Sequence, residues 1–380
     1  MKSLGVYLHI PFCIRKCFYC AFNSYPWQEA LGIRVVKALK KEIEYWGKEL
    51  APFPFAVTTL FLGGGTPTCL GTEQLREILE CCYRHFPIVD GAEISIEANP
   101  GTVDRNKLEN LLKTGVNRLS FGVQSLDNHF LKTLGRIHTK EEFLANYYLA
   151  REIGFKNINL DLIFALPGQS LTQWQETLRQ AVELNPEHLS TYNLVIEEGT
   201  ILAQRLEQGK ITPVDEELDL AMYQETISFL QEKGYHHYEI SNFAKPGMEC
   251  RHNLVYWQNK EYLGLGPGAH SYWGQKRFSN ALSPLDYLKK LEKGKSPLAE
   301  QETIDLDLEM GETMMQGLRL RQGINLVGFQ QRFRLSLEEA YPAQLVKLKS
   351  LGLLIEEKGF LRLTQQGLYL ANQVFAEFLP

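Results

Sequence analysis

Three cysteines lie close together near the start of the chain, spaced Cys13-x3-Cys17-x2-Cys20. Thiolates bind both iron–sulfur clusters and zinc. Three of them can hold three irons of a [4Fe–4S] cubane and leave the fourth iron open to a small molecule. Ligand chemistry alone also allows a zinc site that adds His9, four residues before Cys13. With 7 cysteines, an odd and unevenly spread set, metal binding is favoured over a disulfide framework.

A second group of residues begins at the end of the next strand-like run, as Gly63-Gly64-Gly65-Thr66-Pro67-Thr68. Glycines let a ligand approach the backbone, and backbone groups after a strand can hydrogen-bond its polar head. Without the cysteines, a tight turn would be the better explanation of the same residues. Polar residues also stand at or near the ends of later strand candidates, at Glu97, Asn99, Gln124 and Asp161. An ion pair at the rim of the sheet is the structural alternative for the two acids.

A third group is Arg251-His252-Asn253-Leu254-Val255-Tyr256-Trp257. If this segment is helical, His252 and Tyr256 share one face at spacing i, i+4. Imidazole is a common axial ligand of haem iron and tyrosine a rarer one. The structural alternative is a loop in which His252 bonds the backbone. Cys250 is a further candidate haem ligand, and His270 a candidate beside a substrate pocket. The chain has no Cys-x-x-Cys-His, so c-type haem attachment is not expected.

These residues need a scaffold, and the hydrophobic pattern predicts an α/β fold with parallel strands. The strand candidates are Gly5–Ile10, Thr59–Gly64, Glu93–Ala98, Arg118–Val123, Asn157–Phe164 and His188–Val195. The helix candidates between them lie near residues 27–50, 72–86, 104–114, 140–153 and 171–184. Asp104 suits the N-cap of one helix, and Gly115 and Gly154 suit helix ends. Six such units fit either a doubly wound sheet or an incomplete barrel, and both bind ligands at the carboxyl ends of their strands.

The pattern loosens after residue 196. Residues 197–217 are expected to form a surface excursion, followed by a helix to Lys233 and a strand at Tyr235–Ser241, while Gly264–Gly268 is a turn-rich patch. Helices at Ile304–Leu320 and Ala343–Leu351, then a hairpin at Leu353–Thr364 turning at Lys358-Gly359, predict a small winged-helix domain. We therefore expect three units, at residues 1–200, 201–300 and 301–380, with the His252 segment in the second.

Composition limits the possible functions of this chain. The chain has 380 residues with 44% hydrophobic content, which allows a large core, and its net charge of −5 argues against nucleic-acid binding. No apolar run approaches the roughly 18 residues that a transmembrane segment needs, and the amino terminus does not resemble a signal peptide. We therefore expect a cytoplasmic protein, with contact at a membrane surface left open.

The cysteine motif and its preceding residues, Tyr7-Leu-His-Ile-Pro-Phe-Cys, resemble the radical S-adenosylmethionine (SAM) enzymes. Within them the chain resembles the branch that holds oxygen-independent coproporphyrinogen III oxidase and the HemW-like haem chaperones. The resemblance covers most of the chain. It implies an incomplete (β/α)6 radical SAM barrel with a C-terminal winged-helix-like domain, and so favours the barrel over the doubly wound sheet.

The resemblance also implies cofactors and the residues that hold them. A [4Fe–4S] cluster on Cys13, Cys17 and Cys20 would bind SAM at its open iron, and an electron from the cluster would cleave SAM to a 5′-deoxyadenosyl radical. The implied SAM-site and cluster-flanking positions are Tyr7, Tyr19, Gly63, Gly64, Gly65, Thr66, Glu97, Gln124, Arg136 and Asp161. Among these, the guanidinium of Arg136 suits a carboxylate, and Asp161 suits hydroxyl groups.

Two features separate the oxidase from the haem chaperones within this branch. The oxidase carries a further cysteine two positions after the third cluster cysteine, where this chain has Phe22, as the HemW-like branch does; that branch usually has Asp before it, where Ala21 stands here. The oxidase also has an N-terminal extension, and only four residues precede the first strand candidate here. These features count against decarboxylation of coproporphyrinogen.

The segment His252-Asn-x-x-Tyr256 resembles the haem-binding motif of the chaperone branch. The first hypothesis is therefore a haem chaperone with haem as cargo at His252 and Tyr256. It would deliver haem to haem-requiring proteins, such as respiratory membrane enzymes. A radical SAM oxidoreductase is the second hypothesis, and a zinc-stabilised binding module for a protein partner is the third. Whether the chain is an enzyme is left open.

Overall fold

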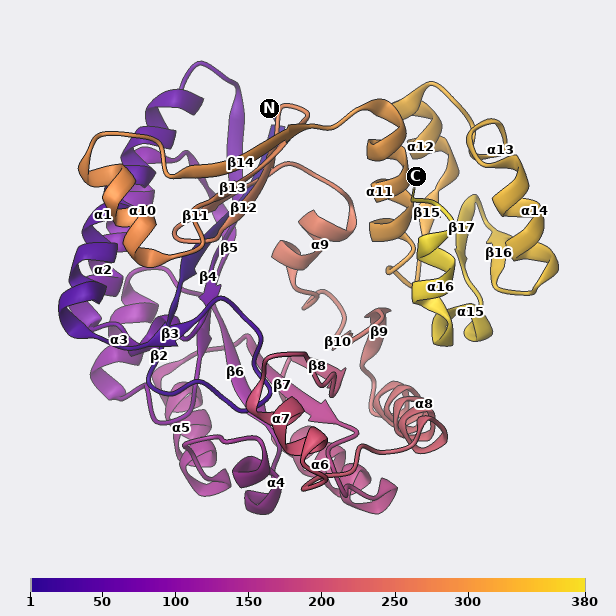
Figure 1. The fold of residues 1–380 in the computed structure, drawn as a ribbon, viewed down its shortest axis with the longest axis horizontal. Helices are drawn as coiled ribbons and strands as arrows, with labels where there is room; N and C mark the ends of the chain where they lie inside the picture. Colours follow the sequence, from indigo (N-terminus) through magenta and orange to yellow (C-terminus); the bar gives the residue numbers. More distant parts are fainter. Residues whose placement is uncertain (1, 380) are drawn as a thin grey trace.

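The computed structural model describes residues 2–379, and its centre is a 12-stranded sheet. The sheet's strands lie in the order β14-β13-β12-β11-β1-β4-β5-β6-β7-β8-β10-β9 (Figure 1). All six predicted parallel strands are present and adjacent: β1 (Lys2–Ile10), β4 (Phe55–Gly64), β5 (Ile88–Ala98), β6 (Arg118–Gln124), β7 (Ile158–Phe164) and β8 (His188–Asn193). The two edge strands, β14 and β9, do not pair with each other in the part of the chain described, so the predicted incomplete barrel is confirmed.

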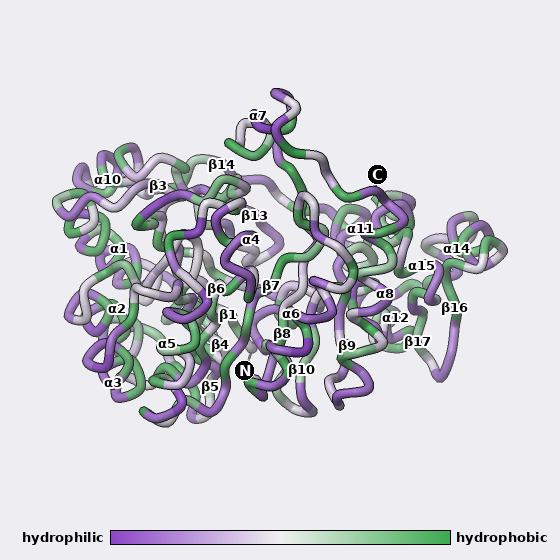
Figure 2. The backbone as a smooth tube through the Cα atoms, turned by 90° about the horizontal axis from the view of Figure 1, so that it is seen from below, coloured by the Kyte–Doolittle hydropathy of each residue, from purple (hydrophilic) through white to green (hydrophobic). Residues whose placement is uncertain are grey.

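The parallel strands are apolar because helices pack on their outer side. The covering helices are α1 (Glu29–Leu50), α2 (Thr72–His85), α3 (Arg105–Lys113), α5 (Lys140–Ile153) and α6 (Leu171–Glu183), with the short α4 (Asn128–Thr133) near the rim. Strand residues such as Leu62, Ile96 and Leu160 are fully buried in the main core. Figure 2 shows hydrophobic and hydrophilic residues alternating along the covering helices, as expected for helices with one buried face.

The helix boundaries follow the predicted capping residues. Asp104 precedes α3, and its carboxylate accepts a hydrogen bond from the Lys107 amide at 2.8 Å. Gly115 and Gly154 follow α3 and α5 with φ of 90° and 114°, a region that favours glycine. The sequence therefore determines these boundaries locally.

The sheet extends beyond the six predicted strands on both sides. Strand β11 (Tyr262–Leu265) pairs in parallel with β1, and β12 (His270–Trp273), β13 (Lys276–Asn280) and β14 (Leu298–Thr303) continue the sheet in antiparallel order, with α10 (Pro284–Glu292) between the last two. On the far side, β10 (Asn242–Ala244) and β9 (His236–Glu239) are antiparallel to β8, and β9 confirms the strand expected at Tyr235–Ser241.

The segments between the main strands include one that differs from the prediction. Residues 197–217 are not only a surface excursion, since α7 (Ile201–Glu207) lies within them and projects from the body in Figure 2. Helix α8 (Glu216–Glu232) follows as predicted, and α9 (Arg251–Trp257) carries the His252 segment. Strands β2 (Phe12–Cys13) and β3 (Tyr25–Pro26) flank the cysteine loop, and the 3-10 turn η1 (Pro67–Cys69) follows β4.

The C-terminal part is a compact group of short helices on a three-stranded sheet, β15-β17-β16. Its elements are α11 (Leu306–Gly317), β15 (Ile324–Asn325), α12 (Leu326–Phe333), α13 (Leu337–Ala340), α14 (Pro342–Ser350), β16 (Leu354–Glu357), β17 (Phe360–Leu363), α15 (Gln365–Tyr369) and α16 (Ala371–Ala376). Lys358 and Gly359 connect β16 to β17 with φ of 52° and 79°, as a tight hairpin requires. The predicted hairpin turn is confirmed.

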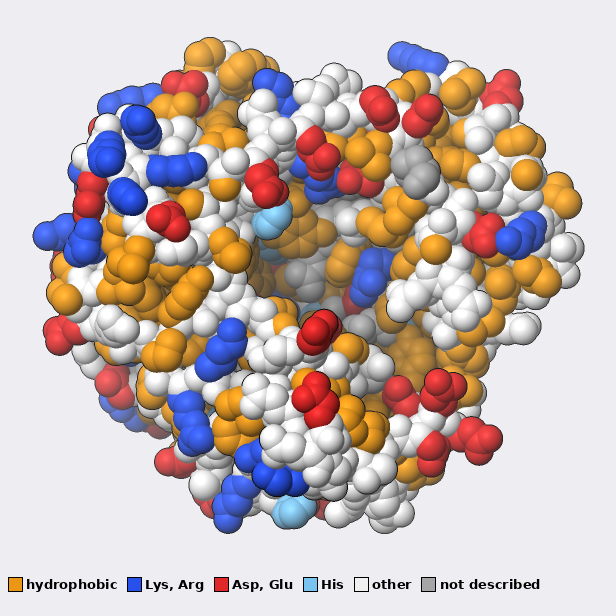
Figure 3. Space-filling model, in the orientation of Figure 1, with side chains coloured by type: hydrophobic (Ala, Val, Ile, Leu, Met, Phe, Trp, Pro, Cys, Tyr) orange, Lys and Arg blue, Asp and Glu red, His pale blue; other side chains and the backbone are white. Residues whose placement is uncertain are grey.

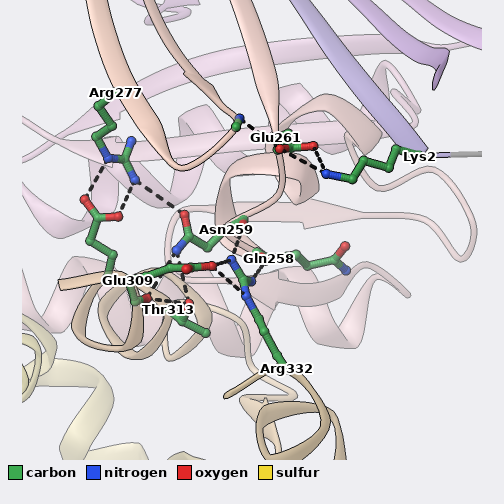
Figure 4. A network of polar contacts seen from close by, with 10 residues as sticks. Lys2, Gln258, Asn259, Glu261, Arg277, Glu309, Thr313 and Arg332 are labelled. Atoms are coloured by element: carbon green, nitrogen blue, oxygen red, sulfur yellow. Dashed lines mark hydrogen bonds and ion pairs between the residues drawn. The ribbon is translucent and has the colours of Figure 1, made fainter. Parts of the chain in front are cut away.

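The C-terminal part is tied to the end of α9 by a polar network (Figure 4). Arg332 of α12 pairs with Glu309 of α11 at 2.6 Å and donates to the Asn259 carbonyl at 3.0 Å. The Asn259 amide donates to Thr313, and Arg277 of β13 pairs with α11 at 2.6 Å. The residues just after α9 are therefore held by the C-terminal part. Figure 3 shows a hollow between that part and the barrel.

One further observation concerns membranes. Of the helices within residues 2–379, none combines the length and apolar character needed to cross a bilayer.

Candidate functional site

Backbone hydrogen bonds tie the cysteine loop to neighbouring segments at two points. Cys13 lies in β2, and its carbonyl accepts a hydrogen bond from the Trp27 amide at 2.8 Å. Between Cys17 and Cys20, Phe18 donates its amide to the Leu134 carbonyl at 2.9 Å. Cys13 is buried, while Cys17 and Cys20 are partly exposed, and all three are free thiols. Burial raises the pKa of the Cys13 and Cys20 thiols, so bound metal would be needed to favour their thiolates.

The three-cysteine site does not gain His9 as a fourth ligand. One ring nitrogen of His9 lies 3.0 Å from the Tyr7 hydroxyl, and the other lies 3.0 Å from the Asn23 carbonyl. No set of three or more His, Cys, Asp or Glu side chains among residues 2–379 is gathered for a single metal ion. A single zinc with Zn–S bonds of about 2.3 Å needs its sulfurs close together, whereas a cubane places each thiolate on a different iron. The donor set thus fits the cluster better than zinc.

The glycine-rich segment after β4 packs directly on the cysteine loop. Gly65 donates its amide to the Ile10 carbonyl at 2.9 Å, and Thr66 donates to the Phe12 carbonyl at 2.7 Å. A Cβ atom at Gly65 would lie 2.5 Å from the Phe12 oxygen, so only glycine allows this approach. The Gly64 amide is also used, by Glu97 at 3.0 Å. The amides of residues 64, 65 and 66 are therefore satisfied inside the protein, and a ligand would meet other groups of the segment.

The two acids of the predicted site lie on β5 and β7 and influence each other. Burial raises the pKa of Glu97 to about 8, and the negative charge of Asp161 adds to that rise. The pKa of Asp161 is also raised, mainly by burial, although Asn159 donates to it at 2.8 Å and Ser120 at 3.2 Å. Neither acid forms an ion pair within the described residues, so the rim ion pair is not observed. A cationic ligand between these acids would favour their ionised forms.

Arg136 contacts the cysteine loop rather than either acid. Its guanidinium donates to the Cys17 sulfur at 3.3 Å and also to Asn99 and the Gly122 carbonyl. Asn99 in turn donates to the Thr66 hydroxyl at 2.6 Å and links β5 to the glycine-rich segment. Asn99 is among the polar residues predicted at the strand ends, but the sequence assigned it no part in binding SAM. Gln124, at the end of β6, has a φ of 69°, a strained conformation for a non-glycine residue.

The two predicted aromatic positions have different surroundings. The Tyr7 hydroxyl contacts His9, and burial followed by the charge of Glu97 raises its pKa. Tyr19 packs against a small apolar cluster that includes Phe130 and Leu166. Burial raises the Tyr19 pKa as well, so both phenols stay protonated and can only donate or accept hydrogen bonds.

Helix α9 presents His252 and Tyr256 on one face, as the spacing predicts. One imidazole nitrogen of His252 (Nδ1) lies 2.8 Å from the Thr59 hydroxyl, and the other (Nε2) lies 2.9 Å from the Tyr256 hydroxyl. Only 1% of His252 is exposed, and its ring stacks on Phe61 with centroids 5.1 Å apart. Burial and the charge of Arg118 lower the His252 pKa to about 3, so the imidazole is neutral. The structure therefore buries a neutral histidine with both nitrogens hydrogen-bonded.

The start of α9 is anchored from the sheet. Glu93 of β5 accepts from the Arg251 amide at 2.9 Å and from the His252 amide at 3.1 Å. A carboxylate at a helix N-terminus is stabilising. Cys250 is buried beside Glu93, and its thiol pKa is raised to about 12, mainly by burial, whereas His270 is exposed at the start of β12. Cys250 precedes α9 and His270 belongs to β12, so neither of these two alternatives lies within the helix that carries Tyr256.

Comparison with known proteins shows which family the chain belongs to. Residues 7–181 match the radical SAM superfamily, and residues 304–370 match the HemN C-terminal domain. A heme chaperone HemW from Bacillus subtilis (strain 168) is 38% identical, covering 100% of this chain and 99% of that protein. One from Mycobacterium tuberculosis is 37% identical over 100% of this chain and 95% of that protein. The chain belongs to the HemW family.

The HemW-type chain also resembles a solved structure closely. It matches the coproporphyrinogen III oxidase (HemN) from Escherichia coli, described as a radical SAM enzyme, with a TM-score of 0.86 and 27% identity, covering 99% of this chain and 90% of that one. The radical SAM fold with a HemN-type C-terminal domain is thus established for this HemW family member. The same fold serves the oxidase and the HemW family, so the two must be separated by residues within the site.

Proposed function

We propose that this HemW family member binds haem and transfers it to haem-requiring proteins. The observation that carries the proposal is the pairing of His252 and Tyr256 on one face of α9. Histidine nitrogen is a common haem ligand, and the names of the relatives add that they are haem chaperones. Phe22, 72% exposed beside the cysteine loop, stands where the oxidase resemblance requires a cysteine.

Cys13, Cys17 and Cys20 would hold a [4Fe–4S] cluster in the same protein. When bound, that cluster supplies an open iron for SAM and an electron for its cleavage. Glu97 and Asp161 would accept hydrogen bonds from the ligand's amino and hydroxyl groups. Gln124, Tyr7 and the segment from Gly63 to Thr66 would line the same space. Arg136 would hold the Cys17 side of the loop in place through its contact with the sulfur.

His252 is arranged so that one nitrogen orients the ring and the other can reach iron. If Nδ1 carries the proton, it donates to Thr59 and leaves the Nε2 lone pair to accept from Tyr256. Metal-binding histidines commonly donate their second nitrogen to such a partner, which fixes the tautomer and the ring orientation. Tyr256 must then turn away before Nε2 binds haem, which leaves its hydroxyl free to contact the haem.

Haem must also gain access to a residue that is 1% exposed. The end of α9 is held by Arg332 and Asn259, through the contacts drawn in Figure 4. Loosening of these contacts would let α9 move away from β4. We propose that the C-terminal part acts on haem binding in this way, since it touches α9 but supplies none of the predicted ligands.

The acceptors would be haem-requiring proteins, including respiratory enzymes in membranes. We propose that the protein works in the cytoplasm and meets such membranes at their surface. The test is haem transfer from the haem-loaded, cluster-reconstituted protein to an apo-globin, followed by visible absorbance. Transfer of one haem per acceptor supports the proposal, and retention of all haem contradicts it.

A radical SAM oxidoreductase acting on a porphyrinogen is the second candidate, favoured by the TM-score of 0.86 to the oxidase. Anaerobic incubation of the reconstituted protein with SAM, a reductant and coproporphyrinogen III decides between them. We expect no vinyl product, because the residue at position 22 is a phenylalanine. Vinyl product would establish oxidase activity instead.

A further inference from the structure

A group of exposed apolar side chains lies beside the cysteine loop. Phe22 is 72% exposed, Leu282 61% and Leu285 60%. The side-chain amide of Asn23 donates to the Leu282 carbonyl at 3.0 Å, so the two segments that carry these side chains are adjacent. Single exposed hydrophobic residues are ordinary, whereas a group of large ones marks a surface that contacts something else. Phe22, Leu282 and Leu285 are called the apolar patch below.

A groove of about 430 Å³ continues the apolar patch. The start of α10, the start of α1 and the strand β3 form its walls, to which Tyr25, Pro26, Leu31 and Leu285 contribute. Arg34 is the charged residue in its lining. The apolar surface therefore extends from the cysteine loop to both helices.

Basic residues border the apolar patch on the side of α10. Residues 284–295 contain four lysines and two acids, although the whole chain has a net charge of −5. Lys289, Lys293 and Lys295 are exposed, and none of them takes part in an ion pair within residues 2–379. Lys289 lies one helical turn after Leu285, so these two side chains are on the same face of α10. Apolar and unpaired cationic side chains are thus combined on one surface.

Helix α1 adds to this positive charge. Its Arg34 pairs with Glu292 of α10 at 2.7 Å, which balances one of the two acids in that segment, while the other, Asp286, is exposed. Lys37 and Lys41 are exposed further along α1. Figure 3 shows Lys and Arg side chains gathered over α1 and α10, with hydrophobic side chains below them toward β3. The face is therefore locally basic on a chain that is acidic overall.

We infer that this face docks on the surface of a bilayer that contains anionic phospholipids. Leu282 and Leu285 enter the boundary between headgroups and acyl chains, and the lysines pair with the anionic headgroups. Lysine is depleted in protein–protein interfaces, whereas lysines beside exposed apolar side chains are typical of surfaces that bind anionic lipid, so a lipid partner is favoured over an acidic protein. The inference rests on the proposed approach to membranes and names the surface that makes the contact.

The test is cosedimentation of the full, cluster-reconstituted chain with vesicles of phosphatidylcholine, alone or mixed with an equal part of phosphatidylglycerol. Binding to the mixed vesicles should be at least about tenfold tighter, and raised salt should weaken it because salt screens the attraction. The double variant Leu282→Ser, Leu285→Ser should weaken this binding about tenfold, and so should the triple variant Lys289→Gln, Lys293→Gln, Lys295→Gln.

Matched control variants change exposed residues of the C-terminal part. The triple variant Lys347→Gln, Lys349→Gln, Lys358→Gln removes the same three charges elsewhere. The double variant Val346→Ser, Leu351→Ser removes apolar side chains that are 72% and 54% exposed. Both controls should bind the mixed vesicles as the wild type does. The cluster absorbance near 400 nm shows that each variant is folded.

The outcomes separate this inference from the proposed function. A wild type that binds neither kind of vesicle, or both equally, overturns the docking face, and so do equal losses in the patch and control variants. If the Leu282→Ser, Leu285→Ser variant changes the oligomeric state without vesicles and leaves vesicle binding intact, the apolar patch contacts a second copy instead. The experiment contains no haem, so its failure leaves haem transfer standing, and a protein that docks but transfers no haem contradicts only the proposed function.

Discussion

The cysteine loop and helix α9 hold their candidate ligand atoms in opposite ways. In the loop, Cys17 and Cys20 are partly exposed, and the Cys17 sulfur accepts a hydrogen bond from Arg136. In α9, His252 is buried and both of its nitrogens have hydrogen-bond partners. The loop therefore leaves two of its three predicted ligand sulfurs accessible from outside. The α9 site must break an existing contact before it binds anything.

This difference points to a division of tasks within one chain. The backbone of the loop is anchored to the rest of the protein through the amides of Phe18 and Trp27. Helix α9 is held by Glu93 at its start and by the C-terminal part at its end. Anchors at both ends of a short helix can keep a site closed until one end is released. Such a site suits a carrier, because a carrier must both bind and release its ligand.

The largest effect is expected at the loop, from Cys17→Ala. Two thiolates cannot hold a cubane in the geometry required, so the broad absorbance at roughly 400 nm after anaerobic reconstitution should be lost. Iron and sulfide content should fall with it. The control is Cys81→Ala, which removes a thiol on α2 outside the loop and should leave the absorbance unchanged. Normal cluster content in Cys17→Ala would contradict the assignment of the loop.

Next in size is the effect of Glu97→Gln on SAM binding. Loss of a charged acceptor should weaken SAM binding to the cluster-loaded protein about tenfold, as measured by calorimetry. An unchanged affinity would remove Glu97 from the SAM site.

Glu97→Gln should also raise the stability of the folded, cofactor-free protein, although it weakens SAM binding. The pKa of Glu97 is about 8 in the folded protein against 4.5 unfolded, so the folded state keeps a proton that the unfolded chain loses between these pH values. Wild-type stability from this group falls as pH rises through that window. In melting curves of cofactor-free protein, the melting temperature of Glu97→Gln should therefore exceed that of the wild type by more at pH 8 than at pH 5. An equal gain at both pH values would contradict the raised pKa.

Thr59 of β4 contacts His252 of α9, and Thr59→Val tests whether this contact orients the His252 ring. Removal of the hydrogen bond to Nδ1 should weaken the His252-dependent haem binding about tenfold, the lower end of the effect known for such supporting contacts. Thr58→Val on the same strand is the matched control, since its hydroxyl contacts Ser3 instead. Equal effects of the two variants would show that Thr59 has no special role.

Tyr256→Phe should act in the opposite direction if Tyr256 only occupies Nε2. Without the hydroxyl, one hydrogen bond no longer opposes haem, and affinity should rise about threefold. A fall in affinity would instead mean that the Tyr256 hydroxyl itself contacts bound haem. Haem titration of Tyr256→Phe and of the wild type under the same conditions therefore distinguishes the two roles.

The smallest effect is expected from Arg332→Gln, which weakens the hold on the end of α9. Arg332 is still partly exposed in its ion pair with Glu309, so removal of the pair should accelerate haem binding only about two- to threefold in stopped-flow measurements. Lys347→Gln, which breaks a different ion pair of the C-terminal part, should leave the rate unchanged. A slower rate in Arg332→Gln would contradict the role given to this contact.

The sequence predicted the parts of the fold that depend on local pattern. The six parallel strands, the caps at Asp104 and Gly154 and the hairpin turn at Lys358 follow from periodicity and turn chemistry within short windows. The added strands β11 to β14 are short, and β14 is largely exposed at the edge, so their pattern is weak. The helix α7 was missed for the same reason.

The site was predictable in its components but not in its contacts. The spacing of Cys13, Cys17 and Cys20 and of His252 and Tyr256 is visible in the sequence. The contact between Thr59 and His252 joins residues 193 positions apart, and no local pattern records such a pairing. Both His252 nitrogens have hydrogen-bond partners only because of this contact. That neither nitrogen is free to bind a ligand could therefore be found only in the structure.

Haem titration of the cluster-reconstituted protein, with wild type and His252→Ala side by side, tests the central claim most directly. The account predicts saturable binding to the wild type and the loss of one equivalent in His252→Ala, with the cluster absorbance near 400 nm unchanged in both. A wild-type protein that assembles its cluster and binds no haem would contradict it.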